Sequence, residues 1–293
     1  MTVGAAASLC ITLRALSDGK DEFITVAPFF PEYTVFTEAT GAKLKVVPIK
    51  KEDFQVDLVE LEKAVTPLTK GIILNSPNNP SGVVYTEETI KGVTVILEAK
   101  QKEFGHPIYL ISDEPYRELV YGDVKVPYLM NYYDNTIVCY SYSKSLSLPG
   151  ERIGYIALSD KLQEERDIYA AVCGAGRALG YVCAPSLMQR VVEKCLRATP
   201  DISEYKKNRD LVYGALTEMG YDCVKPDGAF YLFVKALEED AGAFSERAKE
   251  LGLLIVPGDS FGAPGYVRIS YCVSYDMIKR SLPAFQKLID SYK

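Results

Sequence analysis

The sequence predicts an α/β protein in which helices cover both faces of a mostly parallel sheet, followed by a smaller α+β domain. Short, continuously apolar segments alternate with helical segments over roughly the first 160 residues, which is typical of a parallel sheet. Near residue 205 this alternation gives way to a long helix and several short strands. With 293 residues, 48% of them hydrophobic, the chain can bury two cores. We therefore expect a large domain over residues 1–204 and a small domain over residues 205–293.

The elements of the predicted large domain follow one another at short intervals. A helix begins after Gly4, and Asp57 and Thr86 are typical N-terminal caps for two later helices. Apolar runs that are too short for helices indicate strands buried on both faces. The predicted strands are residues 22–27, 43–49, 71–76, 107–112, 136–141 and 152–158, and the later predicted helices are 31–40, 57–65, 86–104, 160–172 and 184–198.

The predicted small domain begins with a long helix over residues 203–220. Short apolar segments after it indicate four strands with one helix between the second and the third. This order of elements is typical of an α+β unit rather than of a continuing parallel sheet. The four predicted strands are residues 221–225, 229–234, 253–257 and 266–272.

Charge and composition argue against several classes of protein. The net charge is −6 and no long basic run occurs, which argues against nucleic-acid binding. No apolar stretch approaches the length of a membrane span, and the apolar N-terminal run lacks the basic start of a signal peptide. The seven cysteines are scattered singly, mostly in apolar contexts. We therefore expect buried free thiols in a reducing cytoplasm.

The chain contains a single histidine, His106. One histidine argues against a histidine-based zinc site and against a Ser-His-Asp triad, and we predict no metal site. His106 stands just before a predicted strand, where a connecting loop explains it as well as a catalytic role does. The chemistry of this chain is therefore expected from other side chains.

Polar or small residues recur where a ligand site of an open α/β sheet is expected, beyond the carboxyl ends of the strands. Three such segments follow predicted strands, and a small-residue segment precedes the first helix. Taken singly, each has a plain explanation as a turn, a helix cap or a solvated lysine. Together they predict one site at this edge. The segments are PNNPSG (77–82), DEPY (113–116), SYSK (141–144) and GAAAS (4–8).

The set of residues and its order resemble the class I/II pyridoxal-phosphate-dependent aminotransferases, with the aspartate aminotransferase fold (fold type I). The resemblance covers essentially the whole chain. It implies pyridoxal 5'-phosphate as cofactor, an amino acid and a 2-oxo acid as substrates, a homodimer, and a cytoplasmic enzyme that transfers the amino group by a ping-pong mechanism. The residues that carry it are Asn79, Asp113, Tyr116, Lys144, Arg152 and Arg268.

The resemblance implies a role for each residue around the reactive aldehyde and the phosphate. Lys144 would form the Schiff base with the cofactor and later act as general base, and a partly desolvated site with cationic neighbours should lower its pKa. Arg152 and the Ser141 hydroxyl would bind the phosphate. The backbone amides of Ala5 and Ala6 would complete that site at a helix N-terminus.

The resemblance also implies the contacts of the cofactor ring. Asp113 would pair with the ring nitrogen and keep it protonated. Asn79 and Tyr116 would hydrogen-bond the ring oxygen. Phe30 would stack on the ring, although an ordinary core phenylalanine also fits this position and Phe29 is its nearest competitor.

On the substrate side, Arg268, with Asn79, would bind the α-carboxylate in a bidentate pair. The amino donor is expected to be aspartate or an aromatic amino acid, with 2-oxoglutarate as acceptor. Two other functions remain open at this point. The same residues serve carbon–sulfur lyases and decarboxylases of this fold, and an inactive truncated homologue would retain them as well.

Some residues near the motifs have plain explanations. Ser143 is explained by packing at a helix start, and Pro115 would face the ring by position alone. Arg177 lies near the region where some relatives place a second arginine for a distal carboxylate, but a helix-end arginine explains it too. The family also has an N-terminal part before the loop that corresponds to GAAAS, and we expect this chain to lack it. If nothing precedes Met1, we expect weakened cofactor binding in a pocket open to water.

Overall fold

The computed structural model describes residues 1–293 and contains a six-stranded sheet in the order β2-β1-β3-β4-β5-β6. All neighbouring strands are parallel except β5 and β6, which are antiparallel. The predicted mostly parallel sheet is therefore confirmed. The strands are β1 (Glu22–Val26), β2 (Lys43–Val47), β3 (Thr69–Asn75), β4 (Tyr109–Asp113), β5 (Thr136–Ser141) and β6 (Gly154–Leu158).

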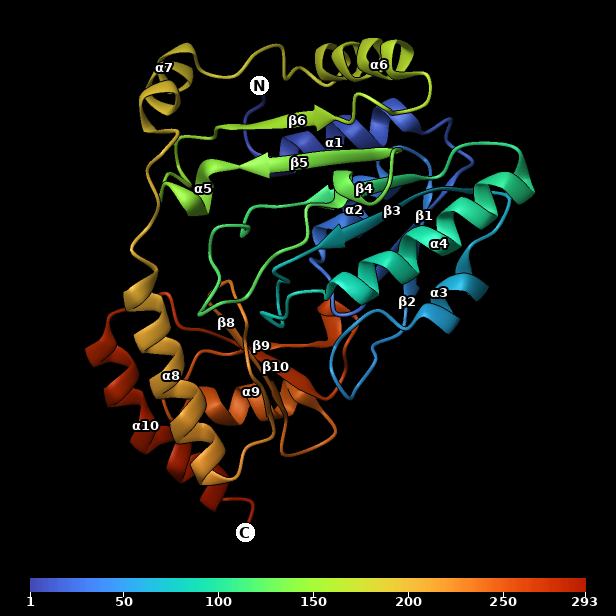
Figure 1. The fold of residues 1–293 in the computed structure, drawn as a ribbon. Coiled ribbons are helices and arrows are strands. Elements are labelled where there is room, and N and C mark those ends of the chain that lie inside the picture. The colour runs from blue at the N-terminus through green and yellow to red at the C-terminus, as the bar shows by residue number, and fades with distance from the viewer.

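Helices cover both faces of this sheet (Figure 1). Successive residues of a strand point to opposite faces, so Ile72 belongs to one core and Ile73 to the other. The core on the first face also contains residues of α3 (Leu58–Ala64) and α4 (Glu87–Phe104). The core on the second face contains residues of α1 (Ala5–Leu16) and α2 (Glu32–Glu38). This double burial explains why the strands are continuously apolar.

Short and peripheral helices complete the large domain. The four-residue α5 (Tyr142–Ser145) follows β5, and α6 (Glu165–Ala178) and α7 (Ser186–Cys195) form its outer layer (Figure 1). The predicted caps are present: the Asp57 side chain accepts hydrogen bonds from two amides of α3, and Thr86 accepts one from an amide of α4. Two short 3-10 helices lie at Leu129–Asn131 and Asp259–Phe261.

The C-terminal part of the chain, which we propose as the small domain, contains a second, antiparallel sheet in the order β7-β8-β10-β9. Two of its helices, α8 and α10, lie side by side (Figure 1), and α10 was not predicted. The predicted boundary at residues 204/205 falls inside α8, so we propose that this domain starts where α8 starts. The elements are α8 (Ile202–Met219), β7 (Cys223–Val224), β8 (Tyr231–Lys235), α9 (Ala241–Glu250), β9 (Val256–Pro257), β10 (Tyr266–Ser270) and α10 (Tyr275–Asp290).

The two domains meet backbone to backbone at two glycines. The amides of Asp227 and Gly228 both donate to the carbonyl of Gly82, each at 2.9 Å. A Cβ atom on Gly228 would lie 2.5 Å from the carbonyl oxygen of Leu119 and 2.8 Å from the ring of Pro77. Only a glycine therefore fits at this point of the junction.

The hydrophobic core of the small domain extends into the large domain. Tyr116, Leu119 and Tyr121, which follow β4, belong to the same buried cluster as the residues of β8 and β10. Because this cluster is shared, the segment that follows β4 is fixed by both domains.

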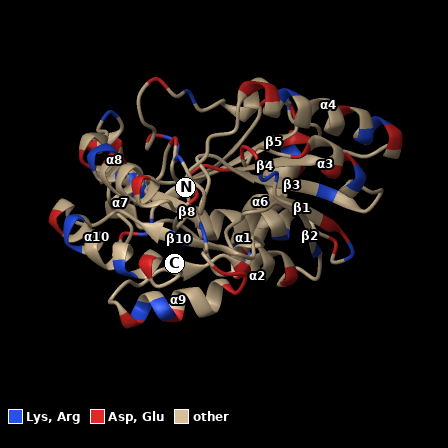
Figure 2. Ribbon diagram, turned by 90° about the horizontal axis from the view of Figure 1, so that it is seen from below, with Lys and Arg blue, Asp and Glu red and all other residues tan.

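Charged side chains lie mainly on the outer helices, where basic and acidic residues alternate (Figure 2). Many form pairs one helical turn apart, such as Lys91 with Glu87 in α4 and Lys206 with Asp210 in α8. Pairs this exposed each contribute roughly 0–1 kcal/mol to stability. None of the helices is both long and apolar enough to cross a membrane.

The cysteines are free, as predicted, but the expectation that they are buried is wrong for most of them. Only Cys139 is buried, because it lies in β5, which is paired with β4 on one side and with β6 on the other. Cys173, Cys183 and Cys272 are exposed. A cysteine with apolar neighbours in sequence is therefore not necessarily buried when it lies in a peripheral helix or at the end of a strand.

We expect Gly228→Ala to destabilise the protein by roughly 1–3 kcal/mol, because its methyl group would overlap the backbone of Leu119. Urea unfolding of the purified protein measures this change. Gly214→Ala in α8 is the matched control, because a Cβ there meets nothing within 4 Å. It should stabilise the protein by up to about 1 kcal/mol. Equal effects of the two substitutions would contradict the tight junction.

Candidate functional site

A cavity of about 340 Å³ lies where β3, β4 and β5 end, between the two domains. A larger hollow of about 650 Å³ beside Pro48 contains none of the predicted site residues. All ten predicted site residues line the smaller cavity: Ala5, Ala6, Phe30, Asn79, Asp113, Tyr116, Ser141, Lys144, Arg152 and Arg268.

The directions of the strands explain why residues so distant in sequence meet here. Because β6 is antiparallel to β5, the start of β6 lies at the end of β5, with Gly154 opposite Ser141. The backbone of Thr2 exchanges two hydrogen bonds with Gly154, of 2.9 and 3.0 Å. Arg152 and the start of α1 are therefore brought to the edge that already carries the ends of β3, β4 and β5.

Gly4 allows the guanidinium of Arg152 to approach the N-terminus of α1. The φ angle of Gly4 is 102°, and a Cβ atom on it would lie 2.7 Å from Nη2 of Arg152. No side chain caps this helix, so the first amides, at Ala5 and Ala6, have no side-chain acceptor. A guanidinium beside free helix amides can bind an anion such as a phosphate.

Two serine hydroxyls lie next to this anion site. Oγ of Ser141 is 2.6 Å from Oγ of Ser143, and it also accepts a hydrogen bond from the amide of Ser143. Ser143 lines the cavity as well, although the sequence favoured a packing role for it. The pair offers two hydroxyls at the end of β5.

Asp113, the last residue of β4, is a buried carboxylate with only one of its oxygens satisfied. The hydroxyl of Tyr33 donates to Oδ2 at 2.6 Å, whereas Oδ1 is buried and has no partner. Burial raises the pKa of Asp113 from 3.8 to about 7, and the bond from Tyr33 partly opposes this rise. No sequence motif indicates a role for Tyr33, which lies in α2. The site therefore holds a carboxylate oxygen that lacks a donor.

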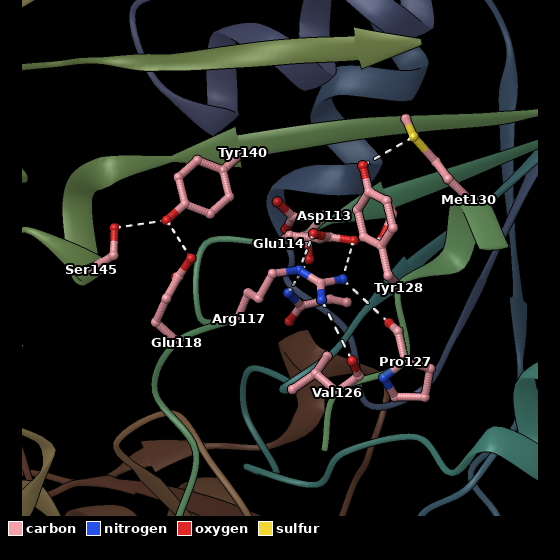
Figure 3. Close-up of polar contacts among 12 residues, drawn as sticks. Asp113, Glu114, Arg117, Glu118, Val126, Pro127, Tyr128, Met130, Tyr140 and Ser145 are labelled. Atoms are coloured by element: carbon pink, nitrogen blue, oxygen red, sulfur yellow. Dashed lines mark hydrogen bonds and ion pairs between the residues drawn. The ribbon is translucent and has the colours of Figure 1, made fainter. Parts of the chain in front are cut away.

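The neighbouring carboxylate, Glu114, is paired with Arg117 (Figure 3). Arg117 donates to both of its oxygens and also to the backbone carbonyls of Val126 and Pro127. Glu114 does not line the cavity. Of the two adjacent acids, only Asp113 is left to interact with a ligand.

Lys144 projects into the cavity from α5. Its Nζ lies 5.3 Å from the centre of the Phe230 ring, which comes from the small domain. Burial lowers the pKa of Lys144, the thiol of Cys272 raises it, and the nearby Arg152 guanidinium lowers it further. The expected lowering is present, with burial rather than the cation as its main cause. A larger share of this amine is therefore neutral than in a lysine exposed to water.

Asn79 and Arg268 join the two domains across the cavity. Nη1 of Arg268, on β10, donates to Oδ1 of Asn79 at 2.9 Å. The side chain of Asn75, at the end of β3, accepts a bond from the amide of Asn79 and donates to the carbonyl of Asp113. No role was predicted for Asn75, yet its side chain links the end of β3 to the end of β4.

The aromatic residues of the cavity come from both domains. Phe30 lines the cavity, whereas Phe29 is buried and packs beside Gly262. Tyr116 is buried, and its hydroxyl lies 3.1 Å from the hydroxyl of Tyr231, a third aromatic lining residue, which the sequence did not indicate. Pro115 also lines the cavity, as expected from its position.

Two residues considered from the sequence lie outside the cavity. His106 bridges two loops, because its ring nitrogens lie at hydrogen-bond distance from the carbonyls of Pro67 and Pro107. Arg177 is exposed in the last turn of α6. Neither residue is among those that line the cavity.

Comparisons with known proteins identify the family of this chain. The family described as aminotransferase class I and II matches residues 1–285. A crystal structure of an amino transferase from Eubacterium rectale is 62% identical in sequence and superposes with a TM-score of 0.98, covering 100% of this chain and 74% of that chain.

Curated relatives are similar over the same length. A probable aspartate aminotransferase of Methanocaldococcus jannaschii is 35% identical over 99% of this chain and 77% of its own. Aromatic-amino-acid aminotransferase 2 of Thermococcus litoralis is 32% identical over 100% of this chain and 76% of its own. The family match, the sequence identity over nearly the whole chain and the shared fold lead to one conclusion. The chain belongs to the class I and II aminotransferases.

Proposed function

We propose that this chain is an aminotransferase that moves an amino group between an L-amino acid and a 2-oxo acid, with pyridoxal phosphate in the cavity at the sheet edge. The observation that carries this proposal is Oδ1 of Asp113, which is buried and has no hydrogen-bond donor. A buried carboxylate oxygen is destabilising unless a ligand supplies a donor. The protonated ring nitrogen of pyridoxal phosphate is such a donor, and a positive charge there would favour the ionised carboxylate.

The other residues of the cavity fit the same cofactor. Arg152, Ser141 and the first amides of α1 suit a phosphate. Phe30 offers a ring face, and Tyr116 offers a hydroxyl whose pKa is raised well above its ordinary value by burial, so that it remains a donor. When bound, pyridoxal phosphate supplies an aldehyde for amines and a ring that withdraws electrons from the substrate Cα.

Lys144 is proposed as the general base. Burial favours its neutral form, and a neutral Nζ can accept the proton from the substrate Cα and later return it. The Phe230 ring on one side of the amine limits its contact with water. A solvated lysine with an ordinary pKa would be almost fully protonated near pH 7 and could not serve in this way.

Arg268 and Asn79 are proposed to bind the substrate α-carboxylate. The guanidinium presents two donors to a carboxylate in a bidentate pair, and Asn79 already holds Nη1 in place. Fixing the carboxylate orients the Cα–H bond of the substrate toward the base. Binding and proton transfer thus depend on residues from both domains.

The choice of donor is proposed from the names of the relatives, because the cavity wall leaves no arginine for a second carboxylate. We propose aspartate or an aromatic amino acid as donor and 2-oxoglutarate as acceptor, in two half-reactions of a ping-pong cycle. Relatives of this chain are named as aspartate and aromatic-amino-acid aminotransferases. The only arginines that line the cavity are Arg152 and Arg268, and both are assigned to other groups.

We further propose that two copies of the chain associate and that the protein is cytoplasmic. The layer formed by α6 and α7 exposes several large apolar side chains, a pattern that favours an interface. Free cysteines are typical of a reducing compartment. The exposed side chains include Tyr169, Leu179, Val182, Leu187 and Leu196.

A screen of amino donors against 2-oxoglutarate, with pyridoxal phosphate added, tests the reaction. We expect glutamate to form with aspartate or an aromatic donor. Lys144→Ala should lower turnover at least ~100-fold, because the base is lost. Lys161→Ala, an exposed lysine outside the cavity, is the control and should retain activity. Release of pyruvate with ammonia, without glutamate, would indicate a lyase, and normal turnover of Lys144→Ala would contradict the role of the base.

The pKa of Asp113 predicts how the stability of the cofactor-free protein depends on pH. The pKa of Asp113 in the folded protein, about 7, lies above its ordinary value of 3.8. The free energy of unfolding is therefore highest below the ordinary pKa, and it falls as the pH rises to the folded pKa. Asp113→Asn removes this loss. The gain in unfolding free energy should be small near pH 4 and reach about 4 kcal/mol at pH 8, at about 1.4 kcal/mol per pKa unit.

Urea unfolding of the cofactor-free variants at pH 5 and pH 8 measures this difference. Asp134→Asn, an exposed acid, is the control and should behave like the parent protein at both values. Tyr33→Phe should lower the free energy of unfolding at pH 8, the opposite of Asp113→Asn, because the Asp113 carboxylate then loses its one hydrogen-bond donor. A gain from Asp113→Asn that is equal at the two pH values would rule out a titrating Asp113.

Light scattering of the purified protein measures the proposed association. We expect a mass of twice 32.5 kDa. Leu187→Glu in α7 places a charge among the exposed apolar residues and should shift the mass toward a single chain. Leu68→Glu, an exposed leucine outside α6 and α7, is the control and should leave the mass unchanged. A single-chain mass for the parent protein would contradict the homodimer.

A further inference from the structure

We propose that Tyr231 is a positioning residue that couples the two ends of the site, because it contacts both Tyr116 and Arg268. This inference rests on the proposed function, in which Tyr116 serves the cofactor ring and Arg268 the substrate carboxylate. Tyr231 begins β8 in the small domain and is only 8% exposed. It is one of the lining residues of the cavity, and none of the motifs recognised in the sequence contains it.

The hydroxyl of Tyr231 faces Tyr116. The two hydroxyl oxygens are 3.1 Å apart, and either can donate. Tyr116 can donate its single proton to only one acceptor. When Tyr116 donates to the cofactor, its oxygen is therefore free to accept the proton of Tyr231. Accepting a hydrogen bond makes a hydroxyl a better donor.

The ring of Tyr231 faces Arg268. The guanidinium carbon lies 4.7 Å from the centre of this ring and 4.8 Å from the centre of the Phe261 ring. Nε of Arg268 is buried without a partner, so its protein hydrogen bonding is limited to the contact of Nη1 with Asn79. The two aromatic rings therefore contribute much of what holds the guanidinium. Each cation–π contact contributes to fixing the cation.

The two contacts of Tyr231 can be separated by substitution. Tyr231→Phe removes the hydroxyl and keeps the ring beside Arg268. Phe261→Leu removes a ring beside Arg268 and leaves the contact of Tyr231 with Tyr116 in place. Tyr231→Leu removes both contacts. These three variants distinguish a coupling role of Tyr231 from a general effect on packing.

The test is a pH titration of the absorbance of bound pyridoxal phosphate, together with KM for the amino donor. Donation from Tyr116 stabilises negative charge on the ring oxygen, and hence the deprotonated form of the bound chromophore. In Tyr231→Phe this donor is weaker, so the spectral pKa should rise by roughly half a unit to one unit, the equivalent of one hydrogen bond. KM should stay within about twofold, because the ring is retained.

Phe261→Leu should give the reverse pattern. KM for the donor should rise roughly fivefold, the effect of one cation–π contact, with the spectral pKa unchanged. Tyr231→Leu should show both changes. The affinity of each variant for pyridoxal phosphate, measured by fluorescence, and its urea midpoint show whether it is folded and loaded.

Two outcomes overturn the inference separately from the proposed function. If the parent protein binds the cofactor and transaminates but Tyr231→Phe titrates as the parent does, the hydroxyl has no role and only the inference fails. If Tyr231→Phe and Phe261→Leu give the same mixture of effects, the role of Tyr231 is only structural. A parent protein that does not take up pyridoxal phosphate overturns both proposals.

Discussion

The pairing of β6 with β5 is the constraint on which the rest of the site depends. Antiparallel pairing with Gly154 opposite Ser141 brings the start of one strand to the end of the other. The same glycine pairs with Thr2, which fixes where α1 begins. A side chain at position 154 would overlap the carbonyl of Tyr140, so this register requires a glycine. Without it, the Arg152 guanidinium and the first amides of α1 would not line the same cavity as the carboxylate at the end of β4.

The second domain completes the site because it is joined closely to the first. The contact of Gly82 with Gly228 and the shared core around Leu119 leave little freedom at the junction. Arg268 reaches Asn79 across this junction, and Phe230 covers the amine of Lys144. Packing and polar contacts from both domains thus hold the same few side chains in place around the cavity.

Much of the fold and the site could be predicted from the sequence, since both depend on strand ends. Apolar runs located β3, β4 and β5, and the residues after them line the cavity. The reversed direction of β6 could not be predicted, because an apolar strand reads alike in both directions. Arg152 was therefore placed by family resemblance and not by topology. The last helix, α10, was not identified, although Ser274 is an ordinary cap for it.

The residues that sequence analysis missed act through contacts distant in the chain. In the sequence, Tyr33 looks like one residue of the apolar face of a short helix. Its hydroxyl nevertheless donates to Asp113, 80 residues away. Tyr231 reads as one more aromatic residue of a strand. Asn75 reads as the last residue of a buried strand. No local pattern marks such partners, because their role depends on which strand end lies opposite.

The backbone of Arg152 has a consequence for how the protein can evolve. Its φ angle is 52°, the left-handed region that only glycine enters without strain, and a residue with a side chain pays roughly 1–2 kcal/mol there. Glycine at this position would relieve the strain and remove the guanidinium. Selection for thermal stability alone would therefore favour the loss of the guanidinium that we propose to bind the phosphate. If Arg152 binds the phosphate as we propose, the strain is a trade-off in which some stability is given up for affinity.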